Sequence, residues 1–275
     1  MYEQYWGLNR NPFANNTEAE FFFRSATHQA ALLKMRYVVE NRLGAGLLTG
    51  GIGYGKSYLV RMLAEELPDQ FGPVVHLVFP QLTATELLSW IAVELGVDES
   101  ELSAGTGGAD RTIRRIQRQL RNYAETHRYP VLVIDEAHLI EDRQVFQALQ
   151  LLLNFQQQPD IDFTLFFIGE RSLSSRINRM AQLDERIAVK SALQPLSEEE
   201  TVGYVEQRLK VAGATRPCFD EQALQSVIEF SGGVPRRINR LCDLALLIGF
   251  ADQLDIVTEQ EIIAAAEEQM AATAA

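Results

Sequence analysis

The sequence predicts an α/β core built around a mostly parallel sheet, followed by a small all-helical domain. Short apolar stretches alternate with helical patterns through the first part of the chain, whereas the patterns from Leu196 onward are helical alone. The length of 275 residues and the hydrophobic share of 47% are typical of a globular protein with one large or two modest domains. We expect a three-layer α/β core over residues 1–194 and a helical domain over residues 195–275.

The strands and helices of the core follow from local patterns, taken in order. Gly46–Thr49 is an apolar stretch that leads into glycines, and a helix over 57–67 places Leu59, Met62 and Leu63 on one face. Further strands are predicted over 73–79, 131–134 and 163–168, and further helices over 85–95, up to residue 124, and over 143–155. Such alternation is typical of a sheet with helices on both faces.

The helices of the second domain are predicted from their first turns. Ser197 and Glu200 have the spacing of a capping box, in which both side chains bind free backbone N–H groups. Thr258 and Glu261 repeat this spacing. Helices are therefore predicted to begin after Ser197 and to run over 220–230, 235–250 and 258–270.

Charge and hydropathy limit the location and the partners of the chain. The net charge is −12, and the residues from Ser197 onward hold 14 acidic and 6 basic side chains. This balance disfavours non-specific binding to nucleic acid, although a local basic patch can still bind it. No apolar stretch approaches the roughly 18 residues of a membrane span, and the start lacks a secretory signal. We expect a cytoplasmic protein without a transmembrane segment, and the scattered cysteines and histidines predict no structural zinc.

A phosphate-binding loop is predicted between the first strand and the helix that follows it. The sequence Gly-Gly-Ile-Gly-Tyr-Gly-Lys-Ser fits the pattern GxxxxGK[ST], whose glycines let backbone N–H groups surround a phosphate chain. Lys56 would neutralise the β- and γ-phosphates of ATP, and the Ser57 hydroxyl would bind Mg²⁺. The alternative is a glycine-rich turn that precedes a lysine by chance. The predicted nucleotide-binding residues are Gly50, Gly51, Ile52, Gly53, Tyr54, Gly55, Lys56, Ser57 and Tyr58.

Two carboxylates follow the apolar strand over 131–134. Asp135 and Glu136 would be costly at the end of a buried strand unless something compensates their charge, and Mg²⁺ would do so. Asp135 is the predicted metal ligand, directly or through water, and Glu136 is the predicted general base toward the attacking water. The alternative is a strand that ends at the surface with two solvated acids. His138, close by, is predicted to be a structural hydrogen-bonding residue.

Two arginines are placed where they could meet the charge that develops on the γ-phosphate. Arg186 precedes the apolar segment that ends the core, so it could lie at a subunit edge. Arg236 follows Pro235 at the start of a helix, where a cation opposes the helix dipole unless an anion lies nearby. An ordinary surface salt bridge is the alternative for each of them.

The chain resembles the AAA+ ATPases, and more closely the ATPase domain of bacterial general secretion pathway protein A and its relatives. The resemblance spans almost the whole chain. It rests on four stretches, which are residues 5–13, the phosphate loop, residues 134–138 and residues 232–239.

The resemblance implies a P-loop ATPase whose helical domain acts as a lid over the nucleotide. It implies assembly into a ring or filament, in which a neighbour's arginine completes each site. Arg186 matches the position of this arginine finger, Arg236 matches the second sensor, and both join Lys56 and Glu136 as catalytic residues. The energy of hydrolysis would drive or time remodelling of an unidentified protein partner, in secretion or cell-envelope assembly.

Two residues depart from the pattern of these relatives. Tyr54 is bulkier than the small residue that usually precedes the final glycine of the loop. Glu170 stands where the secretion relatives carry glutamine, and an acid beside the γ-phosphate would repel it. One alternative function is a DNA-associated AAA+ regulator of the transposition type. A second alternative, prompted by Glu170, is a scaffold that binds ATP without hydrolysing it.

The helix predicted to run up to residue 124, before the strand over 131–134, carries a stripe of arginines. Their spacings of three and four residues place them on one helical face. The stripe consists of Arg111, Arg114, Arg115, Arg118 and Arg121. It is either a solvated face or a partner contact, and we favour the acidic helical domain of a neighbouring subunit over DNA as that partner.

Overall fold

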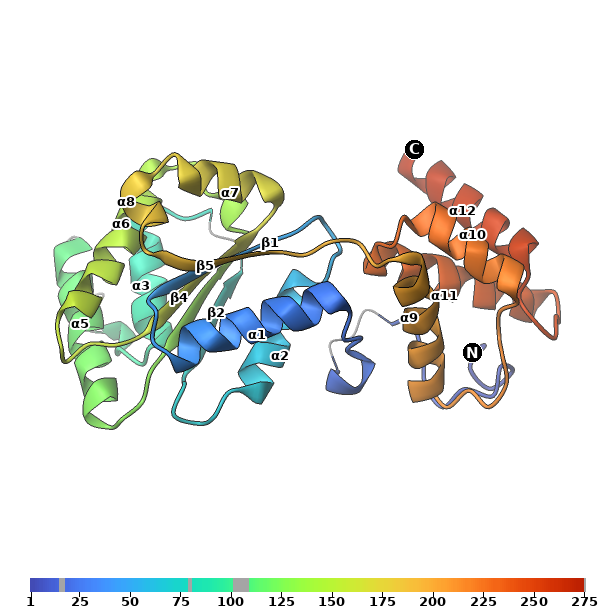
Figure 1. Cartoon of the computed structure of the whole chain (residues 1–275), viewed down its shortest axis with the longest axis horizontal. Helices are drawn as coiled ribbons and strands as arrows, with labels where there is room; N and C mark the ends of the chain where they lie inside the picture. Colours follow the sequence, from blue (N-terminus) through green and yellow to red (C-terminus); the bar gives the residue numbers. More distant parts are fainter. Residues whose placement is uncertain (15–17, 79–80, 101–108, 275) are drawn as a thin grey trace. The chain divides into compact units, whose positions relative to one another are not determined.

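The computed structural model describes residues 1–14, 18–78, 81–100 and 109–274, and these residues form two compact units. The sheet unit comprises residues 27–52 and 59–193, and the helical unit comprises residues 1–26, 53–58 and 194–275 (Figure 1). The N-terminal segment and part of the phosphate loop thus cluster with the helices rather than with the sheet. The expected domains over 1–194 and 195–275 remain a prediction.

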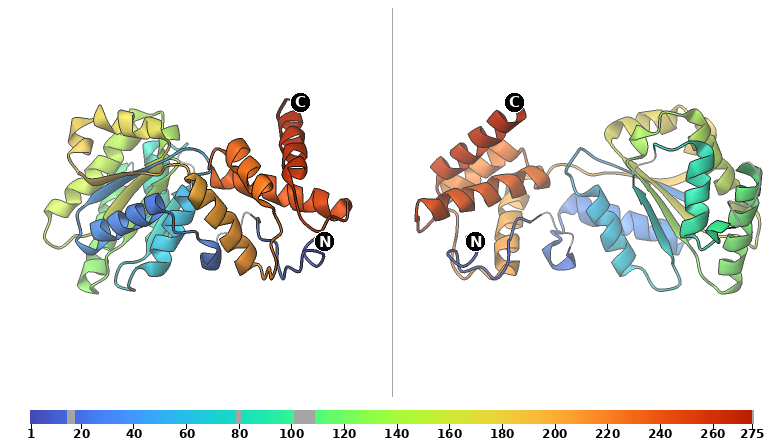
Figure 2. Two further views of the ribbon diagram at one scale, coloured as in Figure 1. Left: turned by 45° about the vertical axis from the view of Figure 1, so that its right-hand side comes forward. Right: turned by 180° about the vertical axis from the view of Figure 1, so that it is seen from behind.

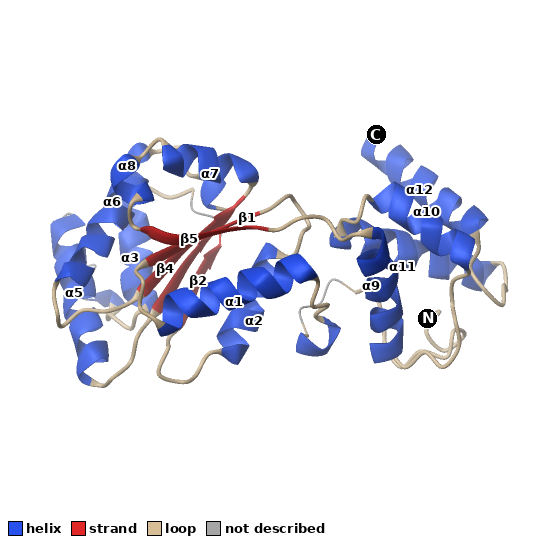
Figure 3. Ribbon diagram, in the orientation of Figure 1, coloured by secondary structure: helices blue, strands red, loops and turns tan. Residues whose placement is uncertain are grey.

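The sheet unit is built on five parallel strands in the order β2-β3-β4-β1-β5 (Figure 3). The strands are β1 (Ala45–Thr49), β2 (Val74–Val78), β3 (Val131–Asp135), β4 (Thr164–Gly169) and β5 (Ile187–Ala192). The first four confirm the predicted strands, apart from Phe79, which lies outside the described residues. β1, β3 and β4 are buried along their whole length, as central strands of a parallel sheet should be.

Helices cover both faces of this sheet, which confirms the predicted α/β class. On one face lie α1 (Ala26–Glu40) and α2 (Lys56–Glu66) (Figures 1 and 3). On the other lie α3 (Ala84–Glu94), α5 (Ala109–Glu125) and α6 (Arg143–Asn154), whose apolar side chains form one cluster with Leu47, Leu132, Phe167 and their neighbours. Two short helices, α7 (Arg171–Asn178) and α8 (Ala181–Asp184), connect β4 to β5.

The helical unit contains α9 (Glu198–Val211), α10 (Glu221–Ser231), α11 (Pro235–Ala251) and α12 (Glu259–Ala274). Both predicted capping pairs are present at the starts of α9 and α12. The Glu200 N–H donates to Ser197 Oγ at 3.1 Å, and the Thr258 N–H donates to Glu261 Oε2 at 2.7 Å. Across the described part of the chain, no helix combines the length and the apolar character that a membrane crossing requires.

The N-terminal segment packs into the core of the helical unit, alongside α9 and α11 (Figure 2). Trp6 is 1% exposed, and its Nε1–H donates to the Leu246 carbonyl oxygen at 3.0 Å. Gly249 makes room for the indole, because a Cβ atom there would lie 3.0 Å from Trp6 Cζ2. The segment is therefore an integral part of the helical unit.

A buried arginine ties the same segment to α9. Arg208 is 2% exposed, and its guanidinium donates to the carbonyl oxygens of Pro12 and Ala14 and to the Tyr204 hydroxyl. It also lies over the ring of Phe21, 4.9 Å from the centroid. Hydrogen bonds to several acceptors compensate the burial of this charge.

Replacing Trp6 by alanine is expected to destabilise the helical unit by about 3–5 kcal/mol, the usual cost of removing a fully buried aromatic side chain. Chemical denaturation measures this change in the free energy of unfolding. Tyr37→Ala is the matched control, because Tyr37 is 54% exposed. A loss below about 1 kcal/mol for Trp6→Ala would show that the segment is dispensable for the fold.

Candidate nucleotide site

The phosphate loop lies between the end of β1 and the start of α2, as the sequence predicts. Gly53 and Gly55 have φ angles of 79° and 89°, in the left-handed region where glycine is favoured. Helix α2 begins at Lys56, a buried residue with 6% exposure, and the exposed Ser57 follows it. The first turn of a helix directs backbone N–H groups toward the loop, which suits an anion.

Within the helical unit, the loop lies against the start of α11. The backbone N–H of Arg236 donates to the Gly53 carbonyl oxygen at 3.3 Å, and a Cβ atom on Gly53 would lie 2.8 Å from Arg236 Cβ. The Arg236 side chain is exposed, and none of the described residues gives its guanidinium a hydrogen bond or an ion pair. The fold therefore brings this arginine to the phosphate loop.

Asp135 ends β3 and is fully buried, with 0% exposure. Its Oδ2 lies 3.0 Å from Nε2 of His76 on the neighbouring strand β2, and its Oδ1 accepts the backbone N–H of Glu136 at 2.8 Å. These two contacts fix the carboxylate at the carboxyl end of the strand. A buried oxygen ligand of this kind suits Mg²⁺.

Glu136 stands just beyond β3, in a left-handed backbone conformation with φ of 53°. This conformation is uncommon outside glycine and turns the chain sharply at the strand end. His138 Nδ1 lies 3.3 Å from Glu136 Oε2, and His138 Nε2 lies 3.2 Å from Glu170 Oε1. The imidazole of His138 thus lies between the carboxylates of Glu136 and Glu170.

The start of the phosphate loop and the acidic residues lie at the same edge of the sheet, where the strands have their carboxyl ends. The carboxyl ends of parallel strands share an edge, and the Gly50 N–H donates to the Gly169 carbonyl oxygen at 3.1 Å, where β1 and β4 end side by side. Glu136 and Glu170 follow β3 and β4 at this same edge. In an open parallel sheet this is the edge where ligands bind.

Arg186 lies at the opposite edge, just before β5 begins. Ile187 pairs with Ala45 at the amino end of β1, so about five residues of strand, roughly 16 Å, separate Arg186 from the edge where the loop starts. Its guanidinium is half-buried and donates to Asn154 Oδ1 at 3.2 Å. Arg186 is therefore too far away to act at the carboxyl edge of its own sheet.

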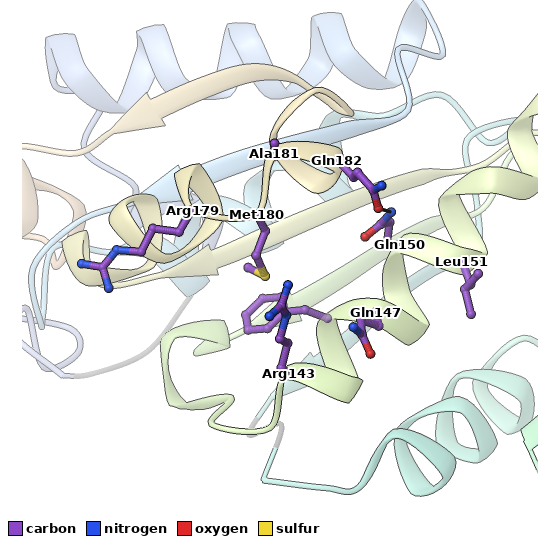
Figure 4. Close-up of a pocket in the computed structure, with 9 residues that line it drawn as sticks. Arg143, Gln147, Gln150, Leu151, Arg179, Met180, Ala181 and Gln182 are labelled. Atoms are coloured by element: carbon purple, nitrogen blue, oxygen red, sulfur yellow. Dashed lines mark hydrogen bonds between the residues drawn. The ribbon is translucent and has the colours of Figure 1, made fainter.

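A pocket of about 480 Å³ lies between α6 and the α7–α8 connection, shortly before Arg186 in the chain (Figure 4). Gln150 and Gln182 hydrogen bond across it at 2.9 Å, and Met180 points into it. Arg143 and Arg179 are exposed lining residues, and neither guanidinium has a hydrogen bond or an ion pair with a described residue. This face of the sheet unit thus carries positive charge that its own described residues do not neutralise.

The arginine stripe lies on α5, and acidic residues neutralise part of it. Arg114 pairs with Asp110 at 3.1 Å, and Arg121 pairs with Asp160 at 2.6 Å. Arg118 is exposed. The choice between a solvated face and a partner contact stays open for this helix.

The structure adds one histidine, His76, to the residues expected from the sequence. His76 is the one strongly polar side chain in the apolar strand β2, which is a signal in the sequence, but its contact with Asp135 depends on strand pairing. His138 is predicted from the sequence to be a structural hydrogen-bonding residue, and its two ring nitrogens lie within ion-pair distance of the Glu136 and Glu170 carboxylates.

A parallel sheet in which an interior strand enters a glycine-rich loop and a helix, with an acid pair after another strand, defines a P-loop nucleotide-binding protein. A family model described as "AAA domain" matches residues 40–177, half of the chain. The chain therefore belongs to the AAA family of P-loop ATPases.

Known proteins resemble the chain in sequence and in structure. General secretion pathway protein A of Aeromonas hydrophila is 32% identical over 98% of the chain, which spans only 48% of that relative's length. The structure of Cdc6p from Pyrobaculum aerophilum matches with a TM-score of 0.72 at 16% identity, over 94% of this chain and 70% of that one. ORC2 of Aeropyrum pernix, solved as ADPNP–ADP complexes, matches with a TM-score of 0.70 at 16% identity, over 94% and 71%. The two structural matches show the fold.

Proposed function

We propose that the chain is a Mg²⁺-dependent ATPase that hydrolyses ATP at an interface between its copies and uses the energy to remodel or assemble a partner. The observation that carries this proposal is the phosphate loop. Its two left-handed glycines precede a buried lysine at the first turn of α2. This combination of backbone and charge suits a triphosphate and little else.

The residues in and around the phosphate loop have separate roles in ATP binding and hydrolysis. Lys56 neutralises the β- and γ-phosphates, while Ser57 and Asp135 hold Mg²⁺. The bound ion supplies Lewis-acid stabilisation of the charge that develops on the phosphate oxygens. Glu136 orients the attacking water and accepts its proton.

The site is completed by a second copy of the chain in a ring or filament. Arg186 lies at the amino edge of its own sheet, so the γ-phosphate that it stabilises is one bound by a neighbour. Arg236 acts at the nucleotide of its own chain, since its backbone contacts the phosphate loop. Residues 195–275, with the N-terminal segment packed into them, serve as the lid domain, and the sheet unit serves as the core.

The partner and the pathway are proposed from the relative alone. The 32% identity to general secretion pathway protein A supports a role in secretion or cell-envelope assembly, exerted from the cytoplasm on a protein partner. Because the chain spans 48% of that relative, the activity of the remaining half is not transferred to it.

Isothermal titration calorimetry with ATP and Mg²⁺ tests the nucleotide site. Lys56→Ala is expected to weaken ATP binding roughly 100-fold, or about 2.8 kcal/mol, because a charge-assisted contact to the phosphates is lost. Lys34→Ala is the matched control, since Lys34 is exposed on α1. Failure of the unsubstituted protein to bind ATP would overturn the proposed function.

Two further measurements separate the alternative functions. ATP-dependent retention on duplex DNA at physiological salt, with a steep loss of affinity as salt increases, would favour the DNA-associated regulator. ATP-dependent assembly without release of phosphate, even from concentrated protein, would favour the non-hydrolysing scaffold.

A further inference from the structure

His138 is held between two carboxylates at the carboxyl edge of the sheet. Its Nδ1 faces Glu136 Oε2 at 3.3 Å, and its Nε2 faces Glu170 Oε1 at 3.2 Å. The imidazole is only 12% exposed, whereas each carboxylate side chain is 36% exposed. The ring thus lies inward of two acids that both border solvent.

The backbone and neighbours of His138 fix its place. Arg176 on α7 donates through Nη1 to the His138 carbonyl oxygen at 3.2 Å and also to that of Ile140. The ring fits because residue 169 is glycine, since a Cβ atom there would lie 3.1 Å from Nδ1 and 3.1 Å from the backbone nitrogen of His138. The histidine has little freedom to move away from the two acids.

Glu170 is directed toward this histidine rather than toward its own helix. It is the N-cap residue of α7, yet its side chain makes no capping hydrogen bond. Asp, Asn, Ser and Thr are favoured at this position because their side chains cap the helix, so the glutamate is not there for that purpose. Its carboxylate oxygen Oε1 instead lies 3.2 Å from Nε2 of His138.

The nitrogen that faces Glu136 is buried and makes no hydrogen bond, although Glu136 Oε2 is within ion-pair distance. A buried nitrogen without a hydrogen bond is unfavourable. A rotation of the Glu136 side chain that aligned Oε2 with a proton on Nδ1 would complete the bond, and it would also change where the carboxylate points. His138 therefore favours one orientation of Glu136.

We propose that His138 is a positioning residue that orients the Glu136 carboxylate, and that Glu170 in turn holds His138. This inference rests on the proposed function, in which Glu136 is the general base. It gives Glu170 a role that does not require the acid to contact the γ-phosphate. Neither His138 nor Glu170 takes up the proton of the attacking water.

Nuclear magnetic resonance of the histidine rings tests the contacts without nucleotide or turnover. The chain has four histidines, and loss of one set of ring ¹⁵N signals in His138→Gln identifies those of His138. Glu136→Gln and Glu170→Gln, which keep the side-chain shape and remove the charge, are each expected to shift these signals. The signals of His28 and His127 should not move. Unchanged His138 signals in both variants would overturn the proposal.

Steady-state kinetics then tests the role in the reaction. Glu170→Gln and His138→Ala are expected to lower kcat roughly 10- to 100-fold with the affinity for ATP unchanged, because misplacing a reacting group by about 1 Å costs up to about 100-fold. The matched control, Glu125→Gln, removes an exposed acid at the end of α5 and should keep the full kcat.

The outcomes separate this proposal from the proposed function. If the unsubstituted protein hydrolyses ATP and Glu136→Gln does not, but His138→Ala and Glu170→Gln keep the full kcat, the positioning role is wrong and the ATPase stands. Weaker ATP binding by Glu170→Gln at unchanged kcat would place Glu170 at the nucleotide and also overturn the proposal. If the unsubstituted protein releases no phosphate, the ATPase function fails, and the ring signals still decide whether His138 binds both acids.

Discussion

Replacing Glu136 by glutamine is expected to lower ATP turnover by roughly 10²- to 10⁴-fold while leaving ATP binding unchanged. The amide keeps the shape of the side chain but cannot accept the proton of the attacking water. Because Lys56, Ser57 and Asp135 remain, the variant should hold ATP and stay in the assembled state. Phosphate release measures turnover, and gel filtration with ATP measures assembly.

Glu141→Gln is the matched control for this experiment. Glu141 is an exposed acid five residues further along the chain, and its replacement should leave turnover unchanged. Equal turnover by Glu136→Gln and the unsubstituted protein would remove Glu136 from the reaction. Loss of ATP binding by Glu136→Gln would instead indicate that the acid supports the nucleotide site.

Arg186→Ala is expected to lower turnover by roughly 10³- to 10⁵-fold, the range reported for arginines that reach the γ-phosphate from a neighbouring subunit. ATP binding should persist, because the arginine contributes nothing to the site of its own chain. Arg186 lies at the edge of the sheet away from the loop, so no rotamer of its side chain spans the roughly 16 Å between the edges.

Mixing two inactive variants distinguishes a shared site from a self-contained one. Arg186→Ala retains an intact phosphate loop, and Lys56→Ala retains Arg186. In a mixed assembly, a Lys56→Ala copy can place its Arg186 at the nucleotide of an Arg186→Ala copy. Recovery of phosphate release on mixing is the expected result, and two variants that stay inactive together would argue against the shared site.

The phosphate loop and the acid pair could be predicted because their residues are close in the sequence. A glycine-rich turn before a lysine, or two acids after an apolar run, carries its chemistry in local order, and the strands around both motifs form as expected. The capping box at Ser197 and the Thr258–Glu261 pair could be predicted for the same reason, since each involves residues three positions apart.

The features that escaped prediction depend on contacts between distant parts of the chain. The Asp135–His76 contact requires β2 to pair with β3 in a register that sets His76 opposite Val133. The edge strand β5 escaped prediction because only Ile187 in it is buried, while exposed positions alternate with half-buried ones along the rest of the strand. The packing of Trp6 against Leu246 joins residues 240 positions apart, beyond any local pattern.

The position of Trp6 also affects how the protein is made. Trp6, Phe13 and Phe21 pack in one cluster with residues of α9 to α12, which are synthesised only after the whole sheet unit. At a translation rate of about 5–20 residues per second, roughly 10–50 s pass between the synthesis of these aromatic side chains and the synthesis of their packing partners. The growing chain therefore exposes these hydrophobic side chains while the sheet unit is synthesised, and exposed hydrophobic segments are what nascent-chain chaperones bind.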